Sequence, residues 1–191
     1  PSKNLNLNSE NFDFNTTQPI LFDRTLKVID EIRKLNILGI KNLMKISDNL
    51  AKLNHERFQK INQNSNPKKP AGFMFSGDTF NGLSIRSLEG SELLLAQQRL
   101  RILSGLYGVL RPFDLIEPYR LEMGTSVNRV MGENLYDFWG KKITNQISKD
   151  LEENNSKYLF NLASKEYFSV INQSNINSKI INFDFKKQKG S

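Results

Sequence analysis

The sequence predicts a mixed fold of helices and strands (α+β, mixed α/β) in a single domain, with a mixed sheet flanked by helices. Three observations lead to this prediction. Apolar residues recur at helical spacing in several segments, short apolar runs bounded by turn residues lie between them, and the chain has 191 residues. That length suits one large domain or two small ones. Because no internal repeat or low-complexity segment divides the chain, we expect one domain over residues 1–191.

The first half of the chain is expected to be mainly helical after a polar arm. Residues 1–20 are rich in Asn and Thr and are expected to be extended. Apolar residues at every third or fourth position predict a helix over 22–36. The same pattern predicts a helix pair within 40–61, in which Ser47 can cap the second helix after a tight turn. Residues 62–70 (NQNSNPKKP) are expected to form a loop.

The second half alternates strands with helices. A short apolar run at 71–78 (AGFMFSGD) is expected to be a buried strand followed by a turn. Helical spacing of apolar residues predicts helices over 90–104 and over 135–151. Two further strands are expected at 158–164 and 179–185, with a short helical piece (KEYFSVI) between them.

Composition excludes several kinds of protein and site. No run of 18 apolar residues is present, so no transmembrane helix is expected. The chain has no Cys and a single His, His55, which excludes disulfides, thiolate metal sites and multi-histidine centres. We therefore expect no metal site and no cofactor, and the absence of Cys fits a reducing, cytoplasmic location.

The positive charge of the chain is concentrated in one segment. Residues 24–69 contain 11 Lys and Arg against 4 Asp and Glu, which gives +7, the net charge of the whole chain. A local basic field attracts polyanions such as nucleic acids. The alternative is a solvated Lys-rich surface without a specific partner.

Residues 103–125 (LSGLYGVLRPFDLIEPYRLEMGT) combine ionisable groups, aromatic residues and backbone breakers. Glycines allow positive φ or close backbone approach, and a residue before proline avoids helical geometry. We therefore expect a rigid, largely non-helical path. In and beside it, the candidates for a cleft that binds anions are Arg101, Ser104, Tyr107, Arg111, Asp114, Tyr119, Arg120 and Glu122.

Two interpretations of this stretch stay open from its chemistry alone. Arg111 and Arg120 can grip a phosphate or carboxylate in a bidentate manner. Alternatively, they pair with Asp114, Glu117 or Glu122 in an internal network that pins a buried loop.

The long motif LRILSGLYGVLRPFDLIEPYRLEMGT closely resembles the signature of the YaaA family of bacterial peroxide-stress proteins. The opening residues 1–4 (PSKN), the run 75–78 (FSGD), the run 135–140 (LYDFWG) and the run 161–168 (NLASKEYF) resemble further family motifs in the same order. By comparison with the family pattern, we expect the chain to lack the family's first strand and its C-terminal basic tail. The resemblance implies that Lys3 and Asp78 join the cleft.

Similarity to this family implies a role in surviving hydrogen peroxide, through less available iron and less oxidative damage. It also implies DNA binding, a positively charged cleft and a helix-hairpin-helix element, which we expect at about 40–54. There, residues 40–51 (IKNLMKISDNLA) keep the apolar frame of that motif, but Lys45 and Ser47 replace its two glycines. Phosphate contacts are expected from Lys41, Lys45, Ser47 and Lys52; an ordinary helix pair with a polar turn is the alternative.

The sequence therefore supports three functional hypotheses. The first is a DNA-binding protein without sequence specificity that protects the cell under peroxide stress and limits iron-driven damage. The second is an enzyme acting on a nucleotide or nucleobase, with its active site in the 103–125 loop. The third is a scaffold for another protein. No membrane partner is expected, and the sequence leaves both the oligomeric state and the existence of a catalytic activity open.

Overall fold

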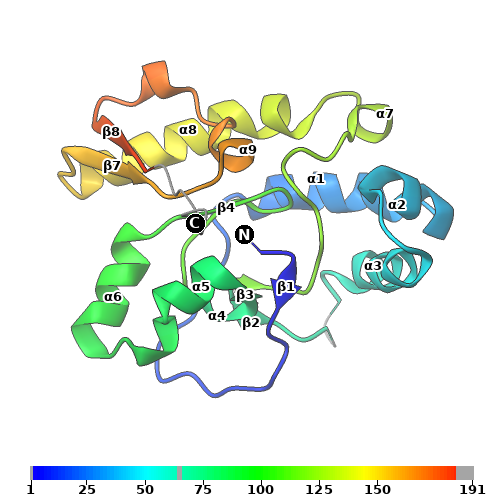
Figure 1. Ribbon diagram of the computed structural model, residues 1–191, viewed down its shortest axis with the longest axis horizontal. Helices are drawn as coiled ribbons and strands as arrows, with labels where there is room; N and C mark the ends of the chain where they lie inside the picture. Colours follow the sequence, from blue (N-terminus) through cyan, green and yellow to red (C-terminus); the bar gives the residue numbers. More distant parts are fainter. Residues whose placement is uncertain (1, 64–65, 184–191) are drawn as a thin grey trace, which may run out of the picture.

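The computed structural model describes residues 2–63 and 66–183, and it confirms the mixed fold and the single domain (Figure 1). The strands are arranged differently from the expected mixed sheet. In the described residues they form four separate two-stranded sheets, pairing β1 with β3, β2 with β6, β4 with β5, and β7 with β8. Each strand is only two to four residues long. Such short strands, next to Pro and Gly, cannot extend a continuous hydrogen-bonded ladder.

Two long helices form one layer of the molecule. Helix α1 (Phe22–Arg33) and helix α8 (Leu135–Glu153) both bury one apolar face, as their periodicity predicts. The side chain of Arg24 joins them, because its guanidinium lies 4.4 Å from the ring centroid of Phe138 and donates to the Phe138 carbonyl at 3.0 Å.

The helix pair expected within 40–61 is also present. Helix α2 (Ile37–Met44) and helix α3 (Asp48–Lys60) lie against one another beside α1 (Figure 1). Asn36 caps the first helix and Ser47 the second through hydrogen bonds from their side-chain oxygens to backbone N–H groups.

The β4–β5 hairpin lies at the centre of the core. Strand β4 (Ile102–Ser104) pairs with β5 (Gly108–Leu110), and the indole N–H of Trp139 donates to the carbonyl of Gly105 at 2.9 Å. A Cβ on Gly108 would lie 2.8 Å from the Trp139 ring, and this glycine has φ of 72°. The hairpin therefore needs glycine here to pack on α8. The helix expected over 90–104 accordingly ends early, with α6 spanning Gly90–Arg99.

The expected strand at 71–78 is wrong in its first half. Residues Ala71–Met74 form a short helix, α4, and only Phe75–Ser76 are extended, as β3. Gly72 packs tightly against Pro112 and Ile85, and its N–H donates to the Pro112 carbonyl at 2.9 Å. An apolar run of this length does not distinguish a buried strand from a buried helical turn.

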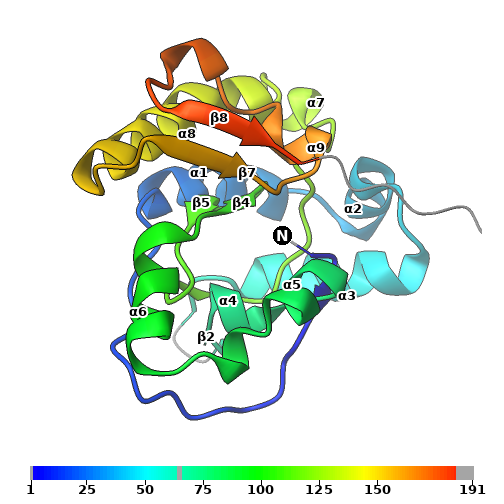
Figure 2. The ribbon, with the colours of Figure 1, turned by 60° about the vertical axis from the view of Figure 1, so that its left-hand side comes forward.

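Several further short elements lie together on one side of the β4–β5 hairpin (Figure 2). Strand β1 (Asn4–Leu5) pairs with β3, and β2 (Lys69–Pro70) pairs with β6 (Leu115–Ile116). Helix α5 (Asp78–Leu83) and the 3-10 turn η1 (Ile85–Ser87) follow β3. A small second core lies beneath them, built from the rings of Phe12, Phe14, Phe73 and Phe113.

The C-terminal part packs on the opposite side, over the β4–β5 hairpin (Figure 2). It comprises α7 (Asn128–Met131), β7 (Tyr158–Asn161), α9 (Lys165–Phe168), the 3-10 turn η2 (Gln173–Asn175) and β8 (Lys179–Asn182). Strands β7 and β8 are parallel and shorter than the expected 158–164 and 179–185. The last two residues of the latter range lie outside the described part of the chain.

No helix in the described ranges 2–63 and 66–183 is both long and apolar enough to cross a membrane.

Candidate functional site

A small pocket lies where three segments that are distant in the sequence meet. Residues beside β1, the segment after β6 and helix α9 contribute its walls, and its volume is about 70 Å³. In Figure 2, the start of the chain lies between α9 and α5. The lining residues are Ser2, Lys3, Tyr119, Arg120, Leu121, Glu122, Glu166 and Tyr167. Four of the expected cleft residues are therefore brought together: Lys3, Tyr119, Arg120 and Glu122.

One carboxylate oxygen bridges both cations of this pocket. Glu122 Oε1 lies 3.1 Å from Lys3 Nζ and accepts a hydrogen bond from Arg120 Nη2 at 3.0 Å. The Lys3 side chain is 61% exposed, whereas that of Arg120 is only 20% exposed. Among the described residues, Arg120 Nε and Nη1 have no hydrogen-bond acceptor. The guanidinium therefore keeps free donors at the pocket.

The β4–β5 hairpin holds the backbone that carries these side chains. A Cβ on Gly105 would lie 2.4 Å from the Leu121 carbonyl, so only glycine lets the hairpin approach this segment. Behind the pocket, the Ser104 hydroxyl lies 2.6 Å from the Tyr119 hydroxyl and accepts from the Tyr107 N–H at 2.9 Å. Ser104 is thus a buried anchor for Tyr119 and does not line the pocket.

Lys3 is placed by the pairing of β1 with β3. The register opposes Asn4 to Ser76, which brings the preceding residues of β1 next to Gly77 and Asp78. Asp78 lies at the start of α5, is exposed, and forms no hydrogen bond or ion pair with the described residues. It is a neighbour of the pocket edge but is not part of its lining.

Sequence reasoning missed four lining residues, Ser2, Leu121, Glu166 and Tyr167, of which the last two bring functional side chains. Glu166 Oε1 accepts a hydrogen bond from the N–H of Gly124 at 2.9 Å, which fixes the carboxylate at the pocket. Burial raises the pKa of the Tyr167 hydroxyl well above its ordinary value, with the Glu166 charge as a further cause. Both residues lie in the run NLASKEYF, whose likeness to the family motif was the available signal.

Arg111 and Asp114 form a separate structural network. Asp114 is fully buried and accepts from Arg111 Nη2 at 2.8 Å, from Arg111 Nε at 3.1 Å and from the Thr17 hydroxyl at 2.6 Å. Arg111 Nη2 also donates to the Gln18 carbonyl at 2.9 Å. Arg111 thus ties the N-terminal arm to the loop, as the internal-network interpretation describes, and it is absent from the pocket.

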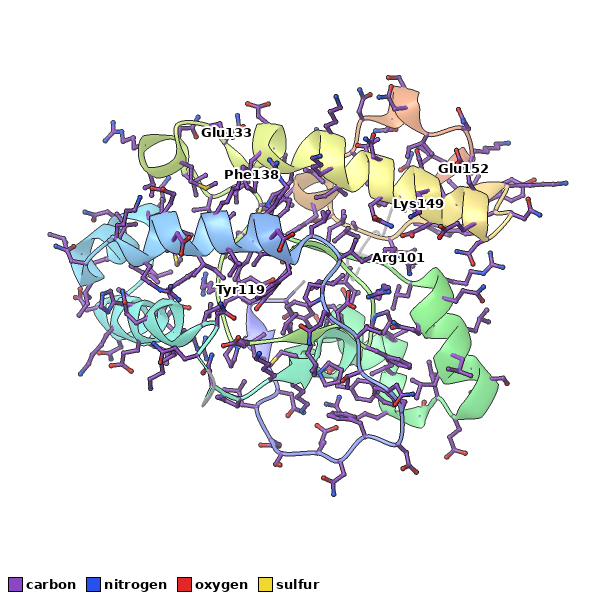
Figure 3. The ribbon with its side chains drawn as sticks, turned by 180° about the vertical axis from the view of Figure 1, so that it is seen from behind. Arg101, Tyr119, Glu133, Phe138, Lys149 and Glu152 are labelled. Carbon is purple, nitrogen blue, oxygen red and sulfur yellow. The ribbon has the colours of Figure 1, made fainter. Side chains whose placement is uncertain are left out.

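Two more of the expected cleft residues are structural. Arg101 pairs with Asp150, joining the end of α6 to α8, and lies far from the interior position of Tyr119 (Figure 3). The buried Tyr107 hydroxyl accepts from the N–H of Glu117 at 3.1 Å, and burial raises its pKa. Burial likewise raises the pKa of Tyr119 well above its ordinary value.

The expected nucleic-acid-binding residues lie in the turn between α2 and α3 and on the two helices beside it. Lys45 and Lys52 are exposed and have no ion-pair partner among the described residues, whereas Lys41 pairs with Asp48 at 2.8 Å. Lys45 has φ of 52° and ψ of 54°, a left-handed conformation that favours glycine. Ser47 starts the second helix as its cap.

Several cations of the basic segment 24–69 make contacts that stabilise the fold. Arg33 donates to the carbonyls of Phe58 and Ile61, and the nearly buried ammonium of Lys69 pairs with Glu10. The charge excess counted in the sequence therefore overstates what is exposed on the surface. Lys45 and Lys52 at the α2–α3 turn remain exposed, as do Lys27, Lys34 and Lys60 elsewhere in this segment.

Within residues 2–63 and 66–183, no group of three or more His, Cys, Asp or Glu side chains has the arrangement of a metal site.

The model of the family described as "Peroxide stress protein YaaA" matches residues 1–191 of the chain. A UPF0246 protein of Idiomarina loihiensis is 47% identical over 191 residues, covering 99% of this chain and 74% of that protein. A UPF0246 protein of Legionella pneumophila (strain Corby) is 41% identical over 194 residues, covering all of this chain and 76% of its own length. One of Alcanivorax borkumensis is 43% identical over 207 residues, covering all of this chain and 80% of its own length.

Proposed function

The chain belongs to the peroxide stress protein YaaA family, and from this premise we propose that it binds DNA without sequence specificity in the cytoplasm during peroxide stress. Bound protein would shield the duplex and limit iron-driven oxidative damage. The surface that we assign to DNA is the turn between α2 and α3, with Lys41, Lys45, Ser47 and Lys52.

The backbone of Lys45 carries this proposal. A helix-hairpin-helix turn places glycine where the chain needs positive φ, and Lys45 adopts that conformation (φ of 52°) despite its side chain. A non-glycine residue in this region is strained by about 1 kcal/mol or more. Contact between the lysine side chain at the tip of the turn and a phosphate would offset this strain.

The same turn offers backbone donors to a phosphate. The first N–H groups of α3 have no partner within the helix, and the positive end of the helix dipole favours an anion there. Asp48 opposes this effect because its carboxylate lies in the first turn of α3 and pairs with Lys41. We therefore expect binding that is weak and dominated by Lys45 and Lys52.

The test is the salt dependence of binding to a DNA duplex. The logarithm of the binding constant should fall with the logarithm of salt concentration by about 0.9 per phosphate neutralised. Replacing Lys41, Lys45 and Lys52 by Glu together should abolish measurable binding.

A control of equal charge replaces Lys141, Lys142 and Lys149 by Glu. These three lysines are exposed on α8, so the change in net charge is matched and only the location differs. Duplex binding should be weakened much less in this control. If the α2–α3 variant binds duplex as tightly as the unmodified chain, the assignment of DNA to this turn is wrong.

The pocket favours a second candidate function, an enzyme acting on a nucleotide or nucleobase. Two cations and two carboxylates from three separate segments meet there. Convergence of such groups in a concave site is the usual basis for binding and transforming a small polar molecule. Incubation with nucleotides and analysis of the products by mass spectrometry would test for turnover.

A further inference from the structure

We propose that the pocket binds a 5′-phosphorylated nucleotide, with the phosphate taken by Lys3 and Arg120 and a ribose hydroxyl taken by Glu166. The inference deepens the second candidate function and rests on the same site. It is independent of DNA binding at the α2–α3 turn. Nucleotide binding can be measured without turnover, so binding and catalysis at the pocket can be tested separately.

Arg120 provides the first line of support. Its side chain is 80% removed from solvent, yet only Nη2 has an acceptor among the described residues, Glu122 Oε1. A guanidinium that is partly buried with free donors is suited to a planar, bidentate contact with a phosphate. Arg111, in the same stretch, is the contrasting case, because its side chain makes three hydrogen bonds to two acceptors, Asp114 Oδ1 and the Gln18 carbonyl.

Glu122 acts as an internal stand-in for the anion. Its Oε1 lies 3.1 Å from Lys3 Nζ and 3.0 Å from Arg120 Nη2, which is where a phosphate oxygen would be held by both cations. The Glu122 side chain is 30% exposed, so it can rotate toward solvent at little cost. A phosphate dianion attracts two cations more strongly than one carboxylate does and can displace it.

Glu166 supplies an acceptor for the sugar. Its Oε1 is held by the Gly124 N–H, which leaves Oε2 for a ligand. A Cβ on Gly124 would lie 3.1 Å from that oxygen, so the glycine permits this close approach. A carboxylate that accepts hydrogen bonds from ribose hydroxyls is a recurrent element of nucleotide recognition.

Tyr167 supplies an aromatic side chain beside this carboxylate, among the residues that line the pocket. Nucleobases stack on aromatic side chains with little dependence on sequence. The pocket volume of about 70 Å³ matches a phosphate and part of a sugar, while the base would lie at the open rim against Tyr167. A free nucleotide and the 5′-terminal nucleotide of a strand share this chemistry.

The experiment is calorimetric titration of the purified chain with AMP, adenosine and inorganic phosphate. AMP should bind, and adenosine and inorganic phosphate should each bind about 10- to 100-fold more weakly, because each lacks charge-assisted hydrogen bonds that the nucleotide makes. A 5′-phosphorylated single strand and its unphosphorylated counterpart then distinguish a strand end from a free nucleotide as the source.

Four variants locate the binding. Lys3→Ala, at an exposed side chain that cannot disturb the core, and Arg120→Ala should each weaken AMP binding about 10-fold or more. Arg129→Ala is the matched control, because Arg129 is exposed and has no ion pair among the described residues. Glu122→Gln should tighten AMP binding several-fold, since the neutral amide competes less for the two cations.

The outcomes separate the proposals. Absence of AMP binding, or AMP binding unchanged in Lys3→Ala, overturns the nucleotide site whether or not duplex DNA binds the α2–α3 turn. Weaker AMP binding in Glu122→Gln also overturns it, because Glu122 would then be a ligand-holding group instead of a competitor. AMP binding without any product would support the nucleotide site and contradict the enzyme hypothesis.

Discussion

Arg111 and Arg120 lie in the same short stretch, but their environments differ in kind. Arg111 faces Asp114, a fully buried carboxylate that also accepts from the Thr17 hydroxyl, and it contributes three hydrogen bonds. Arg120 faces Glu122, a 30% exposed carboxylate that it shares with Lys3, and it contributes one hydrogen bond.

The difference shows that, within one stretch of balanced charges, one ion pair stabilises the fold while another lies at a candidate binding site. A buried carboxylate needs its cation, because an uncompensated charge in the interior is costly. A partly exposed carboxylate shared by two cations depends less on either of them for stability, because solvent screens the pair. The network interpretation therefore holds for Arg111, and the ligand-site interpretation remains the proposal for Arg120.

The largest expected effect concerns the scaffold that both arginines depend on. Trp139→Ala should lower the free energy of unfolding by about 3–5 kcal/mol, because it removes a fully buried ring from the core. It also leaves the Gly105 carbonyl without the indole N–H donor. Chemical denaturation followed by circular dichroism measures this loss. A cost below about 1 kcal/mol would show that the hairpin does not depend on α8.

Arg111→Ala is expected to have the next largest effect. It should lower the free energy of unfolding by about 3 kcal/mol, the lower end of the range for breaking a buried pair. The loss stays at that end because Asp114 keeps its bonds from Thr17 and from the Arg111 backbone N–H. AMP affinity of the folded fraction should be unchanged. Thermal melting together with titration separates the two quantities.

Glu10 extends the comparison to a carboxylate that two cations share in the structural part of the molecule. Its hydrogen bond with Arg86 is the largest cause that lowers the pKa of Glu10 from 4.5 to about 2. Burial, the second-largest cause, opposes it, and the pairing with Lys69 lowers the pKa further. Because the pKa is lower in the folded state, this stabilisation is complete above pH 4.5 and is lost as the pH falls toward 2.

Glu10→Gln should therefore cost about 2 kcal/mol at neutral pH, a typical value for hydrogen bonds to charged groups. The difference in stability between Glu10→Gln and the unmodified chain should shrink as the pH is lowered below 4.5. Denaturation midpoints measured from pH 7 to pH 2.5 provide the readout. A difference that is independent of pH would contradict a lowered pKa of Glu10.

Arg120→Ala should have the smallest effect on stability. Its single bond to a partly exposed carboxylate predicts a change below about 1 kcal/mol in the free energy of unfolding. If this variant loses as much stability as Arg111→Ala, the two arginines are equivalent structural residues and the comparison fails.

Much of the fold is encoded in patterns that can be recognised locally. The periodicity of apolar residues predicts α1, α3 and α8, and the glycines and prolines of 103–125 predict a non-helical path, which the structure contains as β4, β5 and β6. The strand predicted at 71–78 was wrong in its first half. Gly72 in this run packs against Pro112 and Ile85, and contacts with residues distant in the sequence are not visible in a local pattern.

The sequence by itself determined the mixed single domain, the helix pair with its capping Ser47, and the stretch in which charged groups gather. Only the tertiary structure decided which arginine faces the pocket and that Glu166 and Tyr167 complete it. The two arginines differ in how deeply their carboxylate partners are buried, and that burial depends on which distant segments pack together. Asp114 is fully buried and bonded to the N-terminal arm through Thr17, while Glu122 lies at the junction of β1 and α9 and stays 30% exposed.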